Sequence, residues 1–94
     1  MDIQIYERHM EGGDGYEHIA KVKWKGIGDS QAKQMTRQQM VEWLDNSTAN
    51  RAFVNDDHGG RVEVLAVHPA GNPAYVRTSA NGVWTDNLLS LPTY

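Results

Sequence analysis

Residues 20–25 alternate strictly between apolar side chains and lysines, and this pattern constrains the fold more than any other feature of the chain. Successive side chains of a β-strand point to opposite faces, so a period of two predicts a strand with one buried face and one solvated face. Such a strand needs a sheet that covers a core on one side. The segment therefore excludes a purely helical fold.

A second strand is expected at residues 3–10, joined to the strand at 17–25 by the glycine-rich turn at 11–16. In a hairpin that pairs His9 with His18, Ile5 lies opposite Val22 and forms part of one apolar patch. A slip of one residue breaks this patch, but a slip of two preserves it. The pattern alone therefore cannot distinguish this register from one that is shifted by two residues.

A helix is expected from Thr36 to Leu44. Thr36 is a favourable N-cap, and Gln39 three residues later completes a capping box. Met40, Trp43 and Leu44 then form one apolar stripe. A helix of about ten residues is marginal in isolation, so this stripe must pack on the sheet.

Three further strands are expected at residues 52–55, 61–68 and 74–78, with turns at 56–60, 69–73 and 81–82. Residues 61–68 carry apolar side chains on both faces, which predicts a central strand covered on both sides. A short helical turn with three leucines follows Asp86. The sequence thus predicts an α+β fold in a single domain, residues 1–94: a mainly antiparallel sheet of about five strands with one helix packed on it, in the order β-β-α-β-β-β.

Composition excludes several classes of protein. The chain has 94 residues, no cysteine and a formal net charge of −3. The absence of cysteine excludes a disulfide scaffold and a thiolate metal site, and the acidic balance makes a nucleic-acid partner unlikely. No apolar run is long enough to span a membrane, and residues 1–8 lack the pattern of a signal peptide, so we expect a cytoplasmic protein.

The C-terminal part of the chain reads Tyr75-Val76-Arg77-Thr78, a turn, and then Asp86-Asn87-Leu88-Leu89-Ser90-Leu91-Pro92. It resembles the closing signature of small bacterial and phage proteins grouped as domain of unknown function 3892. Residues 15–19 followed by Trp24, and the stretch 36–44, are also similar to this family, although Tyr16 stands where a histidine is often found. The resemblance implies a fold and a bacterial or phage setting, but no activity.

Metal binding is one chemistry to consider. In the hairpin register above, His9 and His18 are neighbours and Glu7 lies two residues away on the same face, so a metal-dependent enzyme is a remote alternative. The chain lacks a His-Glu-x-x-His motif, and we favour the interpretation that these residues form a hydrogen-bonded polar rim of the core. Asp56-Asp57-His58 is interpreted as a solvated turn. We therefore expect no metal and no cofactor.

Arg77 and Asp86 are the more informative pair. An arginine within an apolar strand needs a carboxylate partner because it stays charged, and Asp86 is the nearest one along the C-terminal part of the chain. One interpretation is a structural clamp that holds the C-terminal segment on the last strand. The other is a ligand site in which Arg77 binds an anion. In that site Tyr75, Trp84 and Asn87 add stacking and edge recognition.

These observations favour a non-enzymatic binding or interaction module, because the sequence contains no catalytic constellation such as a Gly-x-Ser-x-Gly elbow. Small sheets with free edges often pair with a second copy or with another protein. The alternative is a binder of a small anion, nucleotide-like or other, at Arg77, Trp84 and Asn87.

Overall fold

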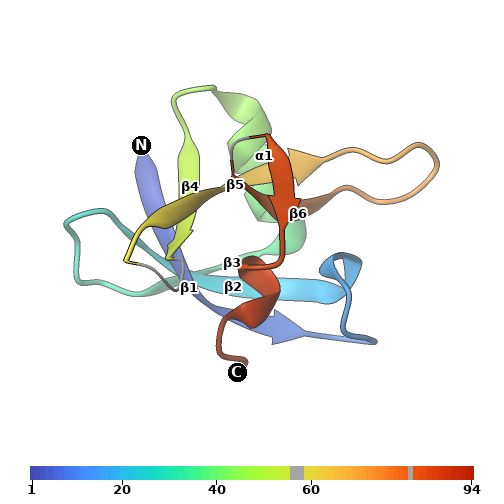
Figure 1. Ribbon diagram of the computed structural model, residues 1–94, viewed down its shortest axis with the longest axis horizontal. Helices are drawn as coiled ribbons and strands as arrows, with labels where there is room; N and C mark the ends of the chain where they lie inside the picture. Colours follow the sequence, from blue (N-terminus) through green and yellow to red (C-terminus); the bar gives the residue numbers. More distant parts are fainter. Residues whose placement is uncertain (56–58, 81) are drawn as a thin grey trace.

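The computed structural model describes residues 1–55, 59–80 and 82–94, and within this part of the chain seven strands form one sheet in the order β3-β2-β1-β4-β5-β6-β7 (Figure 1). The strands are β1 (Asp2–Met10), β2 (Ile19–Gly26), β3 (Lys33–Thr36), β4 (Arg51–Asn55), β5 (Arg61–Val67), β6 (Tyr75–Ala80) and β7 (Val83–Thr85). The helices are α1 (Arg37–Asn46) and the 3₁₀-helices η1 (Tyr16–His18) and η2 (Leu88–Ser90). No helix in the described ranges is long and apolar enough to cross a membrane. The expected turn residues 56–58 and 81 lie outside the described residues.

The α+β class, the α-helix and the mainly antiparallel sheet are confirmed, but the expectation of about five strands is wrong. The two additional strands are β3 and β7, and both are short strands at the edges of the sheet. Each is mostly exposed, so neither carries the alternation of apolar and polar residues that marks a half-buried strand. The observed order is β-β-β-α-β-β-β-β.

Strand β1 lies near the middle of the sheet and is paired on both sides. It pairs antiparallel with β2 and, at residues 2–4, parallel with β4. The expected hairpin register is wrong: Ile5 lies opposite Trp24, and His9 lies opposite Lys21. The observed register differs from the expected one by two residues at Ile3–Ile5 and by three residues at Glu7–His9, between the irregularities that follow Ile5 and His9. At Ile5 the two-residue slip keeps an apolar side chain opposite another one.

The C-terminal segment completes the pairing of β1. The main-chain N–H of Arg8 donates to the oxygen of Pro92, and the N–H of Tyr94 donates to the oxygen of Arg8, both at 3.0 Å. The segment thus lies parallel to β1 beyond the point where its pairing with β4 stops. The expected C-terminal helical turn is present as η2, and its Leu88 is fully buried.

Helix α1 contacts β2, β3, β5 and β6 and so bridges the two halves of the curled sheet (Figure 1). Met40 and Val41 are its buried residues, while Trp43 and Leu44 are only half-buried. Truncation of Trp43 is therefore expected to cost less than the roughly 3–5 kcal/mol of a fully buried tryptophan. The core also includes the following buried side chains: Ile3, Ile5, Tyr16, Ile19, Val22, Ala52, Val54, Val62, Val64, Val76 and Leu88.

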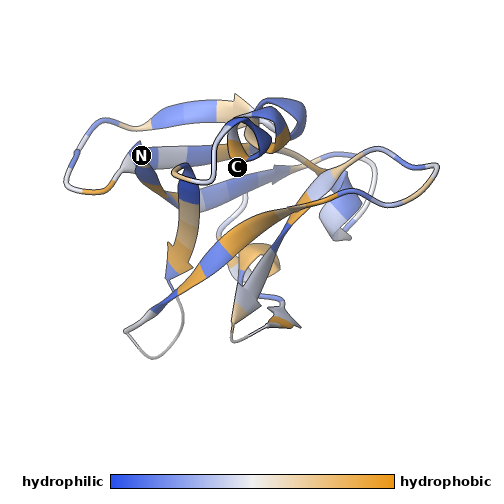
Figure 2. Cartoon of the chain, turned by 90° about the horizontal axis from the view of Figure 1, so that it is seen from above, coloured by the Kyte–Doolittle hydropathy of each residue, from blue (hydrophilic) through white to orange (hydrophobic). Residues whose placement is uncertain are grey.

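Strand β5 is central but is covered on one face only, contrary to expectation. Val62 and Val64 are buried, whereas Leu65, which points to the opposite face, is 38% exposed. Figure 2 shows the corresponding alternation of hydrophobic and hydrophilic bands along the strands. The outer face of β5 therefore carries an apolar side chain that the rest of the described chain leaves in solvent.

The capping box at the start of α1 is confirmed. The Thr36 hydroxyl accepts from the main-chain N–H of Gln39 at 3.1 Å, and the Gln39 side chain accepts from the N–H of Thr36 at 3.0 Å. We predict that Thr36→Ala lowers the free energy of unfolding by about 1 kcal/mol in urea denaturation. Thr48→Ala, an exposed threonine just after the helix, is the matched control and should change it by less than about 0.5 kcal/mol. Equal losses in the two variants would contradict a capping role.

Candidate functional site: the β6–β7 end of the sheet

The main-chain oxygen of Thr85 in β7 accepts hydrogen bonds from two hydroxyl groups. One comes from Tyr16 in η1, and the other comes from Thr78 in β6 at 2.9 Å. Tyr16 is 7% exposed and Thr78 is fully buried. Because η1 leads directly into β2, these bonds tie the first half of the sheet to its last two strands.

Thr78 also anchors the segment that follows β7. Its hydroxyl accepts from the hydroxyl of Thr85 at 2.9 Å and lies 3.5 Å from the main-chain nitrogen of Leu88. The C-terminal segment is therefore held by a buried hydroxyl and by the buried Leu88 side chain. These contacts hold the C-terminal segment at β6 in addition to the Arg77–Asp86 pair of the clamp interpretation.

The Arg77 guanidinium lies near two aromatic rings and one carboxylate. Its centre is 4.9 Å from the ring centroid of Tyr16 and 5.7 Å from that of Trp84, within the range of cation–π attraction. Its Nη2 is 3.5 Å from Oδ1 of Asp86, so the expected contact exists, but it is long, and the Asp86 side chain is 75% exposed. Nε of Arg77 is buried and has no hydrogen-bond partner among the described residues.

The strand register places seven side chains on one outer face, and we call five of them the outer β5–β7 surface: Glu63, Leu65, Arg77, Ser79 and Trp84. The other two, Val67 and Tyr75, lie opposite each other at the far end of the same face. Leu65 lies opposite Arg77, and Ser79 lies between Glu63 and Trp84. Trp84 is 46% exposed. A large aromatic, an aliphatic side chain and an arginine thus share one accessible face.

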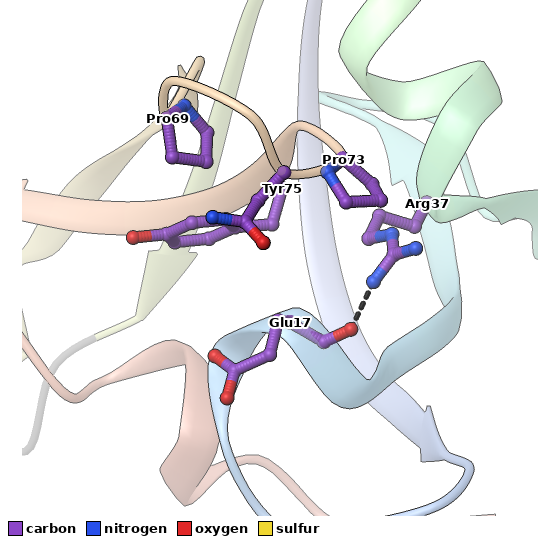
Figure 3. A pocket seen from close by; sticks show the side chains of 6 residues that line it. Glu17, Arg37, Pro69, Pro73 and Tyr75 are labelled. Carbon is purple, nitrogen blue, oxygen red and sulfur yellow. Dashed lines mark hydrogen bonds between the residues drawn. The ribbon is translucent and has the colours of Figure 1, made fainter.

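A cavity of about 450 Å³ lies beside this surface, where η1, the start of α1 and the β5–β6 loop meet (Figure 3). Six residues line it: Glu17, Arg37, Pro69, Asn72, Pro73 and Tyr75. Nη1 of Arg37 donates to the main-chain oxygen of Glu17, and this bond closes one wall of the cavity. The volume lies in the range of small-molecule sites.

The structure separates the predicted site residues into two groups. Arg77, Trp84 and Asp86 lie together on the outer β5–β7 surface or at its rim, whereas Tyr75 lines the cavity. Asn87 is half-buried at the start of η2, and its main-chain oxygen accepts from the N–H of Ser90. The stacking and edge-recognition roles of these side chains stay predictions.

Sequence reasoning missed the other cavity residues. Glu17, Arg37 and the loop at 69–73 are far apart along the chain and share no spacing motif. The only local signal is the pair of prolines in that loop, which fixes its backbone.

The metal hypothesis for Glu7, His9 and His18 fails on the register. His18 lies in η1 and not opposite His9, and its Nε2 is 3.8 Å from a carboxylate oxygen of Glu17. Glu7 is paired with Lys23 at 3.3 Å, and Nδ1 of His9 contacts the main-chain oxygen of Tyr94. Within the described ranges, no three histidine or acidic side chains gather as a metal site would require.

Two of the segments whose sequence resembles a known family, residues 15–19 and residues 75–92, meet at this end of the sheet. A family model described as protein of unknown function (DUF3892) matches residues 4–92. The chain belongs to the DUF3892 family. A search of curated proteins and a search of solved structures found no match. Membership in DUF3892 therefore supports the fold-wide resemblance and carries no activity.

The exposure of Asp86 leads to a prediction about the ion pair. We expect Asp86→Asn to lower the free energy of unfolding by less than about 1 kcal/mol, because exposed pairs contribute little. Thr78→Val, which removes the buried hydroxyl nearby, should cost about 1–3 kcal/mol. Urea denaturation of both variants measures the difference. A loss from Asp86→Asn as large as that from Thr78→Val would show that the ion pair is the clamp.

Burial raises the pKa of the Tyr16 hydroxyl above its ordinary value of 10.0, and nearby Asp86 acts in the same direction. The folded state therefore holds this proton more tightly than the unfolded state does. Its contribution to stability is complete below pH 10 and is lost as the pH rises through the folded-state pKa.

We predict that Tyr16→Phe flattens the decline of stability above pH 10, measured by denaturation from pH 8 to 11.5. Tyr75→Phe, which removes the hydroxyl of a half-buried tyrosine outside the group around Thr85, is the matched control. An unchanged slope in Tyr16→Phe would contradict the raised pKa.

Proposed function

We propose that this chain is a non-enzymatic interaction module that associates with a second copy of itself through the outer β5–β7 surface. The observation that carries the proposal is the exposed Trp84 beside Arg77 and close to the exposed Leu65. Tryptophan and arginine are enriched among the residues that contribute most to protein interfaces. Of the five large apolar side chains exposed in the described residues, two lie on this surface: Leu65 and Trp84.

Charge favours a second copy as the partner. The outer β5–β7 surface carries both signs, Glu63 in β5 and Arg77 in β6, and Glu63 has no ion-pair partner among the described residues. A twofold axis brings a surface against itself, so each Glu63 would face the Arg77 of the other copy. Strand β7 lies next to this surface at the end of the sheet, and among the described strands only β6 pairs with it, so its other edge could add main-chain pairing.

Two expectations from the sequence accompany the proposal. We place the module in the cytoplasm, because its sequence has no cysteine. We place it in a bacterial or phage setting on the basis of the resemblance described above. Binding of a nucleotide-like anion at Arg77, Trp84 and Asn87 is less favoured, because none of these three residues lines the cavity between η1, α1 and the β5–β6 loop.

We predict a dimeric mass that falls to the monomer on dilution, measured by size-exclusion chromatography with light scattering between about 1 μM and 1 mM. Trp84→Ala should weaken dimerisation by at least tenfold, since loss of a central anchor costs about 1.4 kcal/mol or more. Ile27→Ala removes another exposed apolar side chain, 49% exposed, outside the surface, and should have no effect.

A charge reversal tests the partner more sharply. Glu63→Lys places two like charges together in the proposed interface, so it should also weaken dimerisation, and raising the salt concentration should relieve the repulsion. A monomeric mass for the wild type at every concentration would overturn the proposal. A dimer that Trp84→Ala leaves unchanged would exclude this surface.

A further inference from the structure

The cavity between η1, α1 and the β5–β6 loop has a chemistry of its own, separate from the outer β5–β7 surface. Its walls combine a guanidinium, a carboxylate, an amide, one aromatic ring and two proline rings (Figure 3). These groups come from segments that are distant in sequence, so folding alone brings them together. An inference about this cavity does not depend on the proposed self-association.

Arg37 makes one end of the cavity positive. It is half-buried and is the first residue of α1, where the helix dipole adds positive potential. A guanidinium has five N–H donors, and the bond to the main-chain oxygen of Glu17 is the one hydrogen bond Arg37 makes within the described chain. The remaining donors suit a carboxylate, which a guanidinium can bind with two parallel hydrogen bonds.

The opposite side of the cavity is negative. Figure 3 shows the Glu17 carboxylate turned away from Arg37, toward the side on which the Tyr75 ring extends. This carboxylate is exposed, and Nε2 of His18 lies 3.8 Å from one of its oxygens. An ionised carboxylate accepts hydrogen bonds but cannot donate them, so this side favours a ligand with an N–H donor.

The surface between the two charges is flat and largely apolar. Tyr75 is half-buried and presents its ring, and Pro69 and Pro73 hold the adjoining loop. Aromatic and proline rings pack well against a planar ligand. Asn72 adds a side-chain amide, which donates a long hydrogen bond of 3.4 Å to the main-chain oxygen of Ala70.

We propose that this cavity binds a small aromatic carboxylate that also carries an N–H donor. The carboxylate binds Arg37, the ring packs on Tyr75 between the prolines, and the N–H donates to Glu17. This arrangement uses both charges of the cavity and explains why they stand on opposite sides of an apolar floor.

Indole-3-acetate is a suitable probe, because it has a carboxylate, a planar ring and a ring N–H. It is titrated to about 10 mM into the ¹⁵N-labelled full chain, a range suited to a small ligand in an open pocket. We expect saturable shifts at the amides of Glu17, Asn72 and Tyr75. Indole lacks the carboxylate and should bind at least about tenfold more weakly than indole-3-acetate. Phenylacetate lacks the N–H and should bind at least about threefold more weakly than indole-3-acetate.

Matched variants assign the contacts. Arg37→Gln should reduce the affinity for indole-3-acetate to that for indole and leave the binding of indole itself unchanged, which also shows that the cavity is intact. Glu17→Ala should remove the preference for indole-3-acetate over phenylacetate. Arg51→Gln, an arginine paired with Asp2 away from the cavity, is the control and should alter neither.

The proposal is overturned if no probe gives a saturable shift at the three amides. It is also overturned if indole binds as tightly as indole-3-acetate, or if Arg37→Gln and Arg51→Gln have the same effect. Trp84→Ala should leave the binding of indole-3-acetate unchanged. The experiment can therefore disprove ligand binding in the cavity without bearing on the proposed dimer.

Discussion

The arrangement of this molecule depends on the main-chain oxygen of Thr85, which accepts hydrogen bonds from two hydroxyl groups. One hydroxyl belongs to Tyr16, just before β2, and the other belongs to Thr78 in β6. A carbonyl oxygen has two lone pairs, so Tyr16 and Thr78 are accommodated together. This joint fixes η1 beside β6 and thereby creates both the ring contact of Arg77 and one wall of the cavity. Losing it would leave buried polar groups without partners, which is the costly outcome in a small core.

The fold class and the helix could be predicted because they depend on local patterns. The capping box of Thr36 and Gln39 needs only a spacing of three residues, and the alternation at residues 20–25 needs only a period of two. The register of β1 against β2 could not be predicted, because a two-residue slip leaves the same face apolar. The edge strands β3 and β7 were missed for a related reason: exposed strands have no buried face to impose a pattern.

The candidate site shows the same division between local and distant information. Arg77 and Asp86 were paired correctly because they are close in sequence and the carboxylate is the nearest available. The association of Arg77 with Tyr16, and of Tyr75 with Arg37, links segments tens of residues apart. No pattern in a single sequence encodes such contacts. The exposure of Leu65 was also unforeseen, since an apolar residue in a strand reads as buried whether the second face is covered by the same chain or by a partner.

The divided pairing of β1 has a consequence for how the chain acquires its structure. One edge of this strand is paired with β4 at residues 2–4 and with the segment around Thr93 at Arg8. A ribosome releases residue 8 long before residue 93, so β1 waits for most of the chain before its hydrogen bonds are complete. Long-range pairing of this kind slows folding and prolongs the exposure of unpaired strands. Residues 92–94 can dock only after they have left the ribosome, and until then the edge of β1 at Arg8 lacks this pairing.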